Sequence, residues 1–112
     1  MQYMLMICGN EEQMPSPGPL STLQGCSGWA QEMSRRGVLR GGAGLRPSTD
    51  ATTVRVRQDG VLLTDGPFAE TKDQIAGYNV IECADLDEAI EIASKHPAAR
   101  FGSIEVRPLW DA

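Results

Sequence analysis

Two amphipathic helical segments, each set between strand-like runs, constrain the fold of this chain more than any other feature. In the segment 20–36, apolar residues recur at helical spacing, and a second apolar stripe follows along 86–96. Asp85 and Glu88 stand at the spacing of a capping box before the second stripe, and Pro97 ends it. A helix with one apolar face needs a layer to pack on, and flanking strands predict a sheet.

The strand-like runs fall on both sides of the two helices. The runs 1–8 and 75–83 are largely apolar, and Ile104 alternates with charged neighbours in a last strand. The run 38–45 contains several glycines, which indicates a bulge or a close approach by another backbone or a ligand. This order predicts an α+β fold of the ferredoxin-like split βαβ type, with two helices on one face of an antiparallel sheet.

A β-hairpin is inserted between the two βαβ units. Residues 52–57 read Thr-Thr-Val-Arg-Val-Arg, which alternates with the period of a half-buried strand. The pair Asp59-Gly60 predicts a tight turn before a second strand at 61–64. Arg55 and Arg57 share one face of the first strand, either as a solvated edge or as a grip on an anionic ligand.

Composition limits the class of protein. A chain of 112 residues with 41% hydrophobic and 22% charged residues is typical of one globular domain, here 1–112. A net charge of -5 argues against nucleic acid or a membrane surface as a partner. The apolar run 1–9 lacks a basic flank and is too short to span a membrane, so we expect a cytoplasmic protein. Three scattered cysteines and one histidine predict no disulfide, no metal and no other cofactor.

The second face of the predicted sheet has no helix to cover it. Exposed apolar area of that size is rare on monomers, and in a short chain the simplest cover is a second copy. We therefore expect a homodimer that forms through the open sheet face.

Several motifs resemble the YCII-related family in its DGPF form. They are Thr-Asp-Gly-Pro-Phe-Ala-Glu-Thr-Lys at 64–72, Gly-Tyr at 77–78, Ala-Asp-Leu-Asp-Glu-Ala at 84–89, His-Pro-Ala-Ala-Arg at 96–100 and Ser-Ile-Glu-Val-Arg-Pro at 103–108. The resemblance implies a ferredoxin-like protomer in a dimeric α+β barrel, the superfamily that includes muconolactone isomerase-like enzymes. It implies no settled activity. Some relatives are encoded beside extracytoplasmic-function sigma factors, and a few are thought to be small lyases or dehalogenating enzymes with a histidine and aspartate pair.

The chain departs from the family pattern on the first helix. Relatives often have a histidine three residues before an aromatic residue that matches Trp29, and this chain has Cys26 there. If that histidine is the family's acid or base, the chemistry here is altered or absent. No basic residue adjoins Cys26 to lower its pKa, so Cys26 and Trp29 are expected to line the core or a pocket.

Asp65 and His96 are the candidate catalytic residues. Asp65 either bonds backbone amides in the turn or serves as a pocket carboxylate, with Gly66, Pro67 and Phe68 as ligand-binding neighbours. His96 either caps the end of a helix or moves a proton, and the helix dipole favours its protonated form. If the two share a cavity, the carboxylate raises the histidine pKa. Two functions follow: an isomerase or lyase acting on a small, carboxylated or aromatic molecule, or a non-catalytic ligand-binding or regulatory module, linked to a sigma factor.

Overall fold

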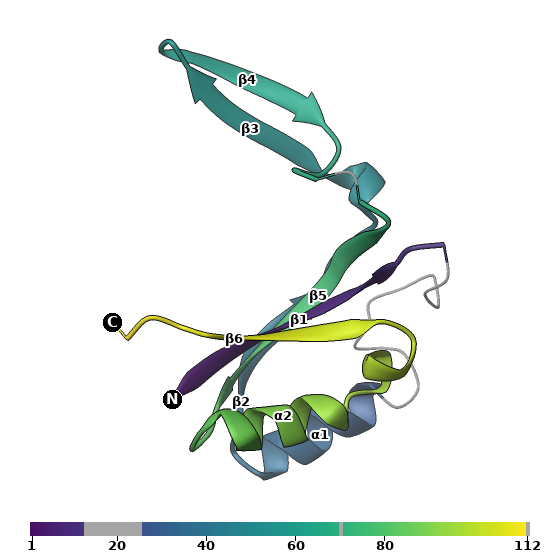
Figure 1. Ribbon diagram of the computed structural model, residues 1–112, viewed down its shortest axis with the longest axis vertical. Helices are drawn as coiled ribbons and strands as arrows, with labels where there is room; N and C mark the ends of the chain where they lie inside the picture. Colours follow the sequence, from purple (N-terminus) through teal and green to yellow (C-terminus); the bar gives the residue numbers. More distant parts are fainter. Residues whose placement is uncertain (13–25, 70, 112) are drawn as a thin grey trace.

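The computed structural model describes residues 1–12, 26–69 and 71–111 and has a mixed α+β architecture (Figure 1). A four-stranded antiparallel sheet has the order β2-β5-β1-β6, and β3 and β4 form a separate two-stranded sheet. The order of the four strands is that of the ferredoxin-like fold predicted from the sequence. The elements are β1 (Gln2–Asn10), α1 (Cys26–Arg35), β2 (Leu39–Gly44), η2 (Ser48–Asp50), β3 (Thr52–Arg57), β4 (Gly60–Asp65), β5 (Asp73–Glu82), α2 (Leu86–Ser94), η3 (Pro97–Arg100) and β6 (Ser103–Pro108).

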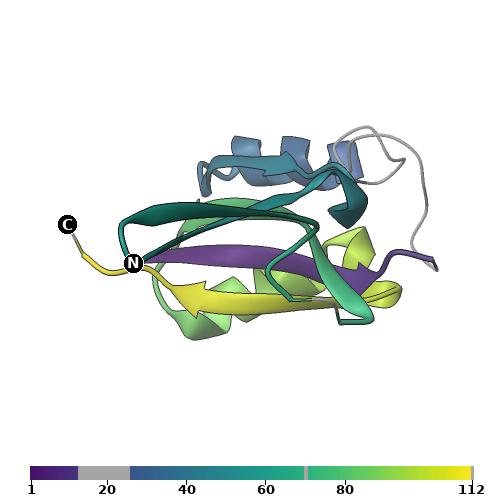
Figure 2. The same ribbon diagram turned by 90° about the horizontal axis from the view of Figure 1, so that it is seen from above.

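The core lies between one face of the sheet and the two helices, which cover that same face (Figures 1 and 2). Alternate residues of β1 point into it, because successive strand side chains face opposite ways. The largest fully buried side chains come from β1, β5 and both helices: Leu5, Ile81, Met33 and Ile92. Each contributes roughly 1.5–3 kcal/mol to folding, so this layer dominates the stability of the domain.

The second helix begins as its sequence predicts. The Asp85 carboxylate accepts a hydrogen bond from the Glu88 N–H at 2.9 Å, and the Glu88 carboxylate accepts one from the Ala84 N–H at 3.1 Å. The first bond satisfies an amide that the first turn of a helix leaves without a partner, and the second holds the backbone just before the cap. The helix ends at Ser94, two residues before the predicted end at His96, because the residue before a proline is pushed out of helical geometry.

The first helix is described from Cys26 onward. The predicted start at 20–25, with Ser21 as its cap, lies outside the described residues. The helix ends at Arg35, one residue before the predicted end, and Gly37 follows with a positive φ of 74°. This is the glycine stop that the sequence predicts.

The inserted hairpin is present and its turn is one residue earlier than expected. Arg57 pairs with Gly60, so the two loop residues are Gln58 and Asp59, with positive φ values of 50° and 63°. Such angles give a tight turn whose twist matches that of the strands. The hairpin projects from the end of the body at which β5 begins (Figure 1).

The other face of the four-stranded sheet is open. No helix of the described residues covers it, and it carries half-buried apolar side chains from β1 and β5: Met4, Met6, Tyr78 and Val80. We call these four residues the open-face patch.

Candidate functional site

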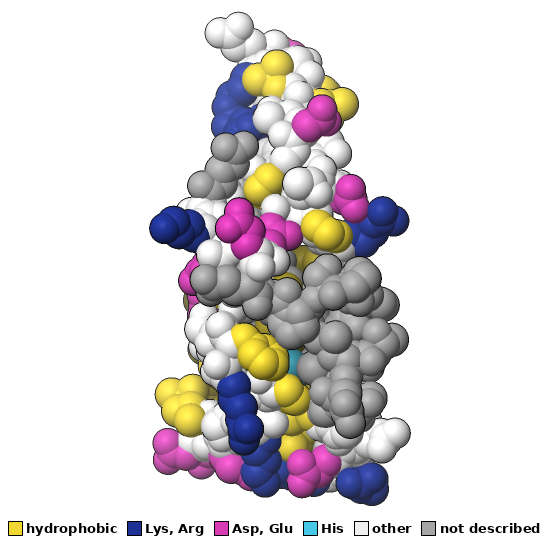
Figure 3. Space-filling model, turned by 90° about the vertical axis from the view of Figure 1, so that its right-hand side faces the viewer, with side chains coloured by type: hydrophobic (Ala, Val, Ile, Leu, Met, Phe, Trp, Pro, Cys, Tyr) yellow, Lys and Arg dark blue, Asp and Glu magenta, His cyan; other side chains and the backbone are white. Residues whose placement is uncertain are grey.

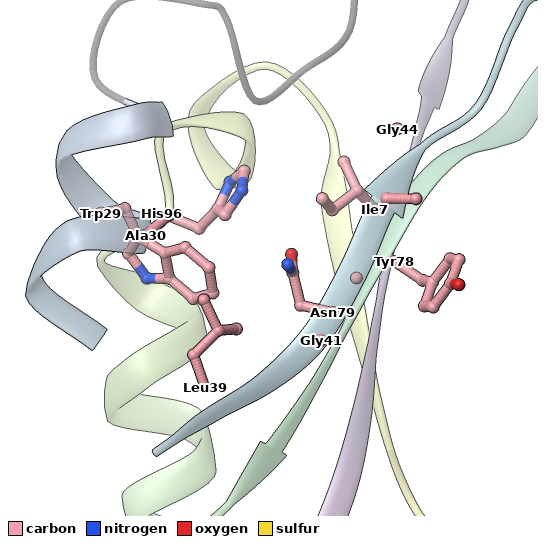
Figure 4. Close-up of a pocket in the computed structure, with 11 residues that line it drawn as sticks. Ile7, Trp29, Ala30, Leu39, Gly41, Gly44, Tyr78, Asn79 and His96 are labelled. Carbon is pink, nitrogen blue, oxygen red and sulfur yellow. The ribbon is translucent and has the colours of Figure 1, made fainter. Parts of the chain in front are cut away.

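A pocket of about 280 Å³ opens on the helix side of the sheet, between α1, η3 and strands β2 and β5 (Figure 4). Its lining is mostly apolar or backbone, and none of the described lining residues is acidic or basic apart from one histidine. The lining residues are Ile7, Trp29, Ala30, Leu39, Gly41, Gly42, Ala43, Gly44, Tyr78, Asn79 and His96. In such a site a few polar groups fix the orientation of a ligand.

His96 is the most deeply buried polar group of the pocket, with 3% of its surface exposed. It precedes Pro97 and caps the short helix η3, where its Nδ1 accepts a hydrogen bond from the Ala98 N–H at 3.0 Å. An N–H can only donate to an unprotonated nitrogen, so the neutral ring carries its proton on Nε2. Among the described residues, the hydrogen bond of the His96 side chain is made through Nδ1.

Burial lowers the pKa of His96 below its ordinary value. The sequence led us to expect that the helix dipole favours the protonated ring, with a further rise in the His96 pKa only if Asp65 shares its cavity. The expected effect of the dipole is wrong for two reasons. The helix ends before His96, so the ring does not lie on its last turn. Desolvation, which disfavours the imidazolium form, is the cause of the shift.

The Trp29 indole contacts the His96 imidazole. Its indole N–H donates to the Ile92 carbonyl at 3.0 Å, which ties α1 to the last turn of α2. The two ring centroids lie 4.8 Å apart at an interplanar angle of 65°, an edge-to-face contact. With one ring fixed by a backbone carbonyl and the other by a backbone amide, this wall of the pocket is preorganised. Figure 3 shows a small area of the histidine, in cyan, beside hydrophobic side chains.

The opposite wall is the glycine-rich strand β2. A Cβ at Gly42 would lie 2.4 Å from both the Asn79 Nδ2 and the Tyr78 carbonyl oxygen, so only glycine lets β2 approach β5 here. The register also shifts between Leu39 and Gly41. Of the predicted alternatives, the close approach of another backbone is confirmed at Gly42, and the register shift marks a bulge or irregularity beside it.

Asn79 supplies the second polar group of the pocket. Its side chain points toward the space beside Trp29 and His96, whereas Tyr78 points away from it (Figure 4). Our sequence reading did not single out Asn79. The sequence signal was the position of Asn79 in the strand. Side chains alternate between the two faces of a strand, so Asn79, two residues before the buried Ile81, places its amide on the inward face of β5.

Asp65 and the loop after it lie at the base of the hairpin. Asp65 is the exposed last residue of β4 and is not among the residues that line the pocket. The loop is held by Gly66, whose N–H donates to the Ala51 carbonyl at 2.7 Å and whose carbonyl accepts from the Thr53 hydroxyl at 2.8 Å. Phe68 is 84% exposed. The structure thus brings Trp29 and His96 together, and places Asp65, Gly66, Pro67 and Phe68 outside the pocket lining.

The cysteines of the described residues are not activated as nucleophiles. Burial, with acidic neighbours, raises the pKa of both Cys8 and Cys83. Cys26 is the first residue of α1, and its side chain lies outside the described part of the structure. Within that part, no three His, Cys, Asp or Glu side chains cluster as metal ligands would, and no helix is long and apolar enough to cross a membrane.

Comparison with known proteins identifies the relatives of the chain. A family model described as "YCII-related domain" matches residues 1–112. The uncharacterized protein R00369 of Rhizobium meliloti (strain 1021) is 36% identical in an alignment 110 residues long, and the match covers 93% of this chain and 89% of that protein.

Proposed function

This chain belongs to the YCII-related domain family, and we propose that it is a cytoplasmic protein that binds a small, uncharged, flat organic molecule in the His96 pocket. The observation that carries the proposal is the fixed state of His96. A buried neutral imidazole, with Nδ1 occupied by the Ala98 amide, presents one N–H donor at Nε2. Such a group recognises a carbonyl or another neutral acceptor.

The described lining residues carry no Asp, Glu, Lys or Arg side chain, and this selects against ionic ligands. Moving an anion out of water is expensive unless a cation or several donors meet it, and the described lining supplies neither an arginine nor a lysine. Protonating His96 to provide the cation would place a second N–H against the Ala98 N–H. A carboxylated ligand, which the sequence left open, is therefore disfavoured relative to its amide.

The size and shape of the pocket point to a ring with one or two substituents. A cavity of about 150 Å³ holds benzene in other proteins, so the 280 Å³ here leaves room for a polar substituent. The Trp29 indole and the bare backbone of β2 give two extended surfaces between which a flat molecule fits. The Asn79 amide can then donate to, or accept from, a second polar atom of the same ligand.

Acid–base catalysis by Asp65 and His96 is the second candidate. It is favoured by the fact that the one histidine of the chain lines the pocket. Because Asp65 is not in that lining, catalysis by the pair needs Asp65 from another copy of the chain. The non-catalytic alternative is a regulatory role beside an extracytoplasmic-function sigma factor. In that role the pocket would bind a small molecule without converting it.

We also propose membership of the DGPF subgroup and a homodimer that assembles as an α+β barrel. The dimer is supported by the open-face patch, because half-exposed methionine, tyrosine and valine side chains on one sheet face gain from a matching surface.

Calorimetric titration with benzamide and benzoate as probes tests the binding proposal. The two probes share a ring and a carbonyl group and differ in charge, so benzamide should bind at least tenfold more tightly. His96→Asn keeps an acceptor near the position of Nδ1, whereas His96→Gln keeps an N–H near the position of Nε2. Benzamide affinity should fall more in the Asn variant than in the Gln variant. Tighter binding of benzoate, or equal losses in both variants, would sink the proposal.

A further inference from the structure

The Asn79 amide is oriented by the strand beside it. Asn79 pairs with Gly42 of β2, and paired residues have their side-chain positions on the same face of a sheet. A Cβ at Gly42 would lie 2.4 Å from the Asn79 Nδ2, so the amide nitrogen rests against the bare α-carbon of this glycine. The Asn79 Oδ1, on the other branch of the amide, is the atom left to face the pocket.

The two polar side chains that point into the pocket are chemically different. Neutral His96 offers an N–H donor at Nε2, because its Nδ1 accepts from the Ala98 N–H. Asn79 offers an acceptor at Oδ1. Figure 4 shows both side chains on the same side of β5 as the Trp29 indole, whereas Tyr78 points the other way. A donor and an acceptor that face one space are matched by a ligand with an acceptor and a donor.

We infer that the ligand is a planar lactam, or a flat ring with an equivalent amide edge. Its carbonyl accepts from the His96 Nε2–H, and its adjacent N–H donates to the Asn79 Oδ1. The inference rests on the proposed function and narrows the neutral ligand to one class. The N–H and C=O of such a ring lie in the ring plane, so both bonds form at its edge while its faces contact Trp29 and the backbone of β2.

Burial gives this pair of groups its selectivity. His96 is 3% exposed and Asn79 is half-buried, so water is displaced from both when a ligand enters. A polar group that loses water without gaining a partner opposes binding, and a site built to hydrogen-bond a ligand N–H therefore rejects analogues without it. A lactone offers two acceptors, and its ring oxygen would face the Asn79 Oδ1 with lone pairs on both sides.

Calorimetric titration of the full chain with 2-pyridone and 2-pyranone tests the inference. The two rings have nearly the same shape and the same carbonyl, and an oxygen in the second replaces the N–H of the first. We expect 2-pyridone to bind about tenfold more tightly or better, because the pyranone leaves the Asn79 Oδ1 without a donor. The isomer 4-pyridone, whose N–H and C=O stand at opposite ends of the ring, should bind more weakly than 2-pyridone by a similar factor.

Three variants on one strand separate the role of the Asn79 oxygen from other effects. Asn79→Leu removes the amide at nearly constant volume and should reduce the preference for 2-pyridone over 2-pyranone to less than about threefold. Asn79→Asp keeps an oxygen at the position of Oδ1 and should retain the preference. Gln74→Leu removes an amide of β5 that lies outside the pocket lining and donates to the Ala69 and Thr71 carbonyls, so the preference should not change.

The outcomes distinguish this inference from the proposed function. Equal affinities for 2-pyridone and 2-pyranone, in a wild-type chain that binds benzamide, would overturn the inference and leave the proposed function standing. A full preference for 2-pyridone in Asn79→Leu would also overturn it, because the ligand N–H would then be recognised by another group. If Asn79→Leu loses its far-UV circular dichroism, Asn79→Ala takes its place. A wild-type chain that binds none of these rings would overturn both proposals.

Discussion

Replacing Gly42 by alanine should both destabilise the fold and disrupt the pocket. The new methyl group would lie 2.4 Å from the Tyr78 carbonyl oxygen and 2.9 Å from the Asn79 Cα, which are backbone atoms of β5 and cannot rotate away. Overpacking of this kind costs about 1–3 kcal/mol, and a non-glycine residue at a φ of 154° adds about 1–3 kcal/mol of strain. The expected loss is therefore about 2–6 kcal/mol, a large part of the roughly 5–15 kcal/mol that stabilises a domain.

Urea unfolding followed by circular dichroism measures this loss, with Gly28→Ala as the control. A Cβ at Gly28 meets nothing within 4 Å, and the residue lies within α1. Alanine there should stabilise the protein by about 0.5–1 kcal/mol through helix propensity. With an m-value near 2 kcal/mol/M, the Gly42→Ala midpoint should fall by roughly 1–3 M. Equal midpoints for Gly42→Ala and the wild type would refute the reasoning. So would rescue by Asn79→Ala, because the backbone contacts with Tyr78 and Asn79 persist without the amide.

Three further predictions concern the protonation of His96, its coupling to Asp65 and the cap of the second helix. The folded-state pKa of His96 lies below the unfolded value of 6.5, so the unfolded chain binds more protons between the two values, and stability should fall as the pH drops through that window. His96→Asn should remove this fall, and urea midpoints measured across the window will check it. Asp65→Asn should leave the His96 pKa unchanged in an NMR titration; a clear decrease would show coupling, through one protomer or two. Asp85→Ala should cost about 1 kcal/mol of unfolding free energy in thermal melts, whereas Asp87→Ala, two residues further along and not at the cap, should cost less.

The fold was predictable because its signals are local. Helical periodicity, the Asp85 capping box and the alternation along 52–57 each depend on a few neighbouring residues, and strand order follows from the arrangement of the βαβ units. The predicted ends of the second helix and of the hairpin strands were wrong by one or two residues, and both errors have local causes. Pro97 removes His96 from helical geometry, and pairing of Arg57 with Gly60 moves the turn to Gln58 and Asp59.

The candidate site was predictable only in part because it depends on how the elements pack. Trp29 and His96 were found as residues, but their contact comes from the packing of α1 against the end of α2, which no local pattern reports. Asp65 was linked to His96 through the possibility of a shared cavity. That link took no account of β4 lying in a separate hairpin, outside the main sheet. The position of Asn79 in the strand alternation places it on the same face as Ile81. Predicting that this face lines the pocket required knowing which face of β5 the helices cover.

Our proposal of binding rather than proton transfer rests on the hydrogen bond that His96 Nδ1 already accepts. A general base must offer a lone pair to the ligand, and the lone pair of neutral His96 is already taken by the Ala98 amide. A general acid must lose the Nε2 proton, and the described lining holds no cation to stabilise the resulting imidazolate. At constant protonation, the ring can donate one hydrogen bond from the buried wall of the pocket. A donor of this kind polarises a carbonyl, so the same geometry that favours binding would also assist a reaction whose base comes from the ligand or from a second copy of the chain.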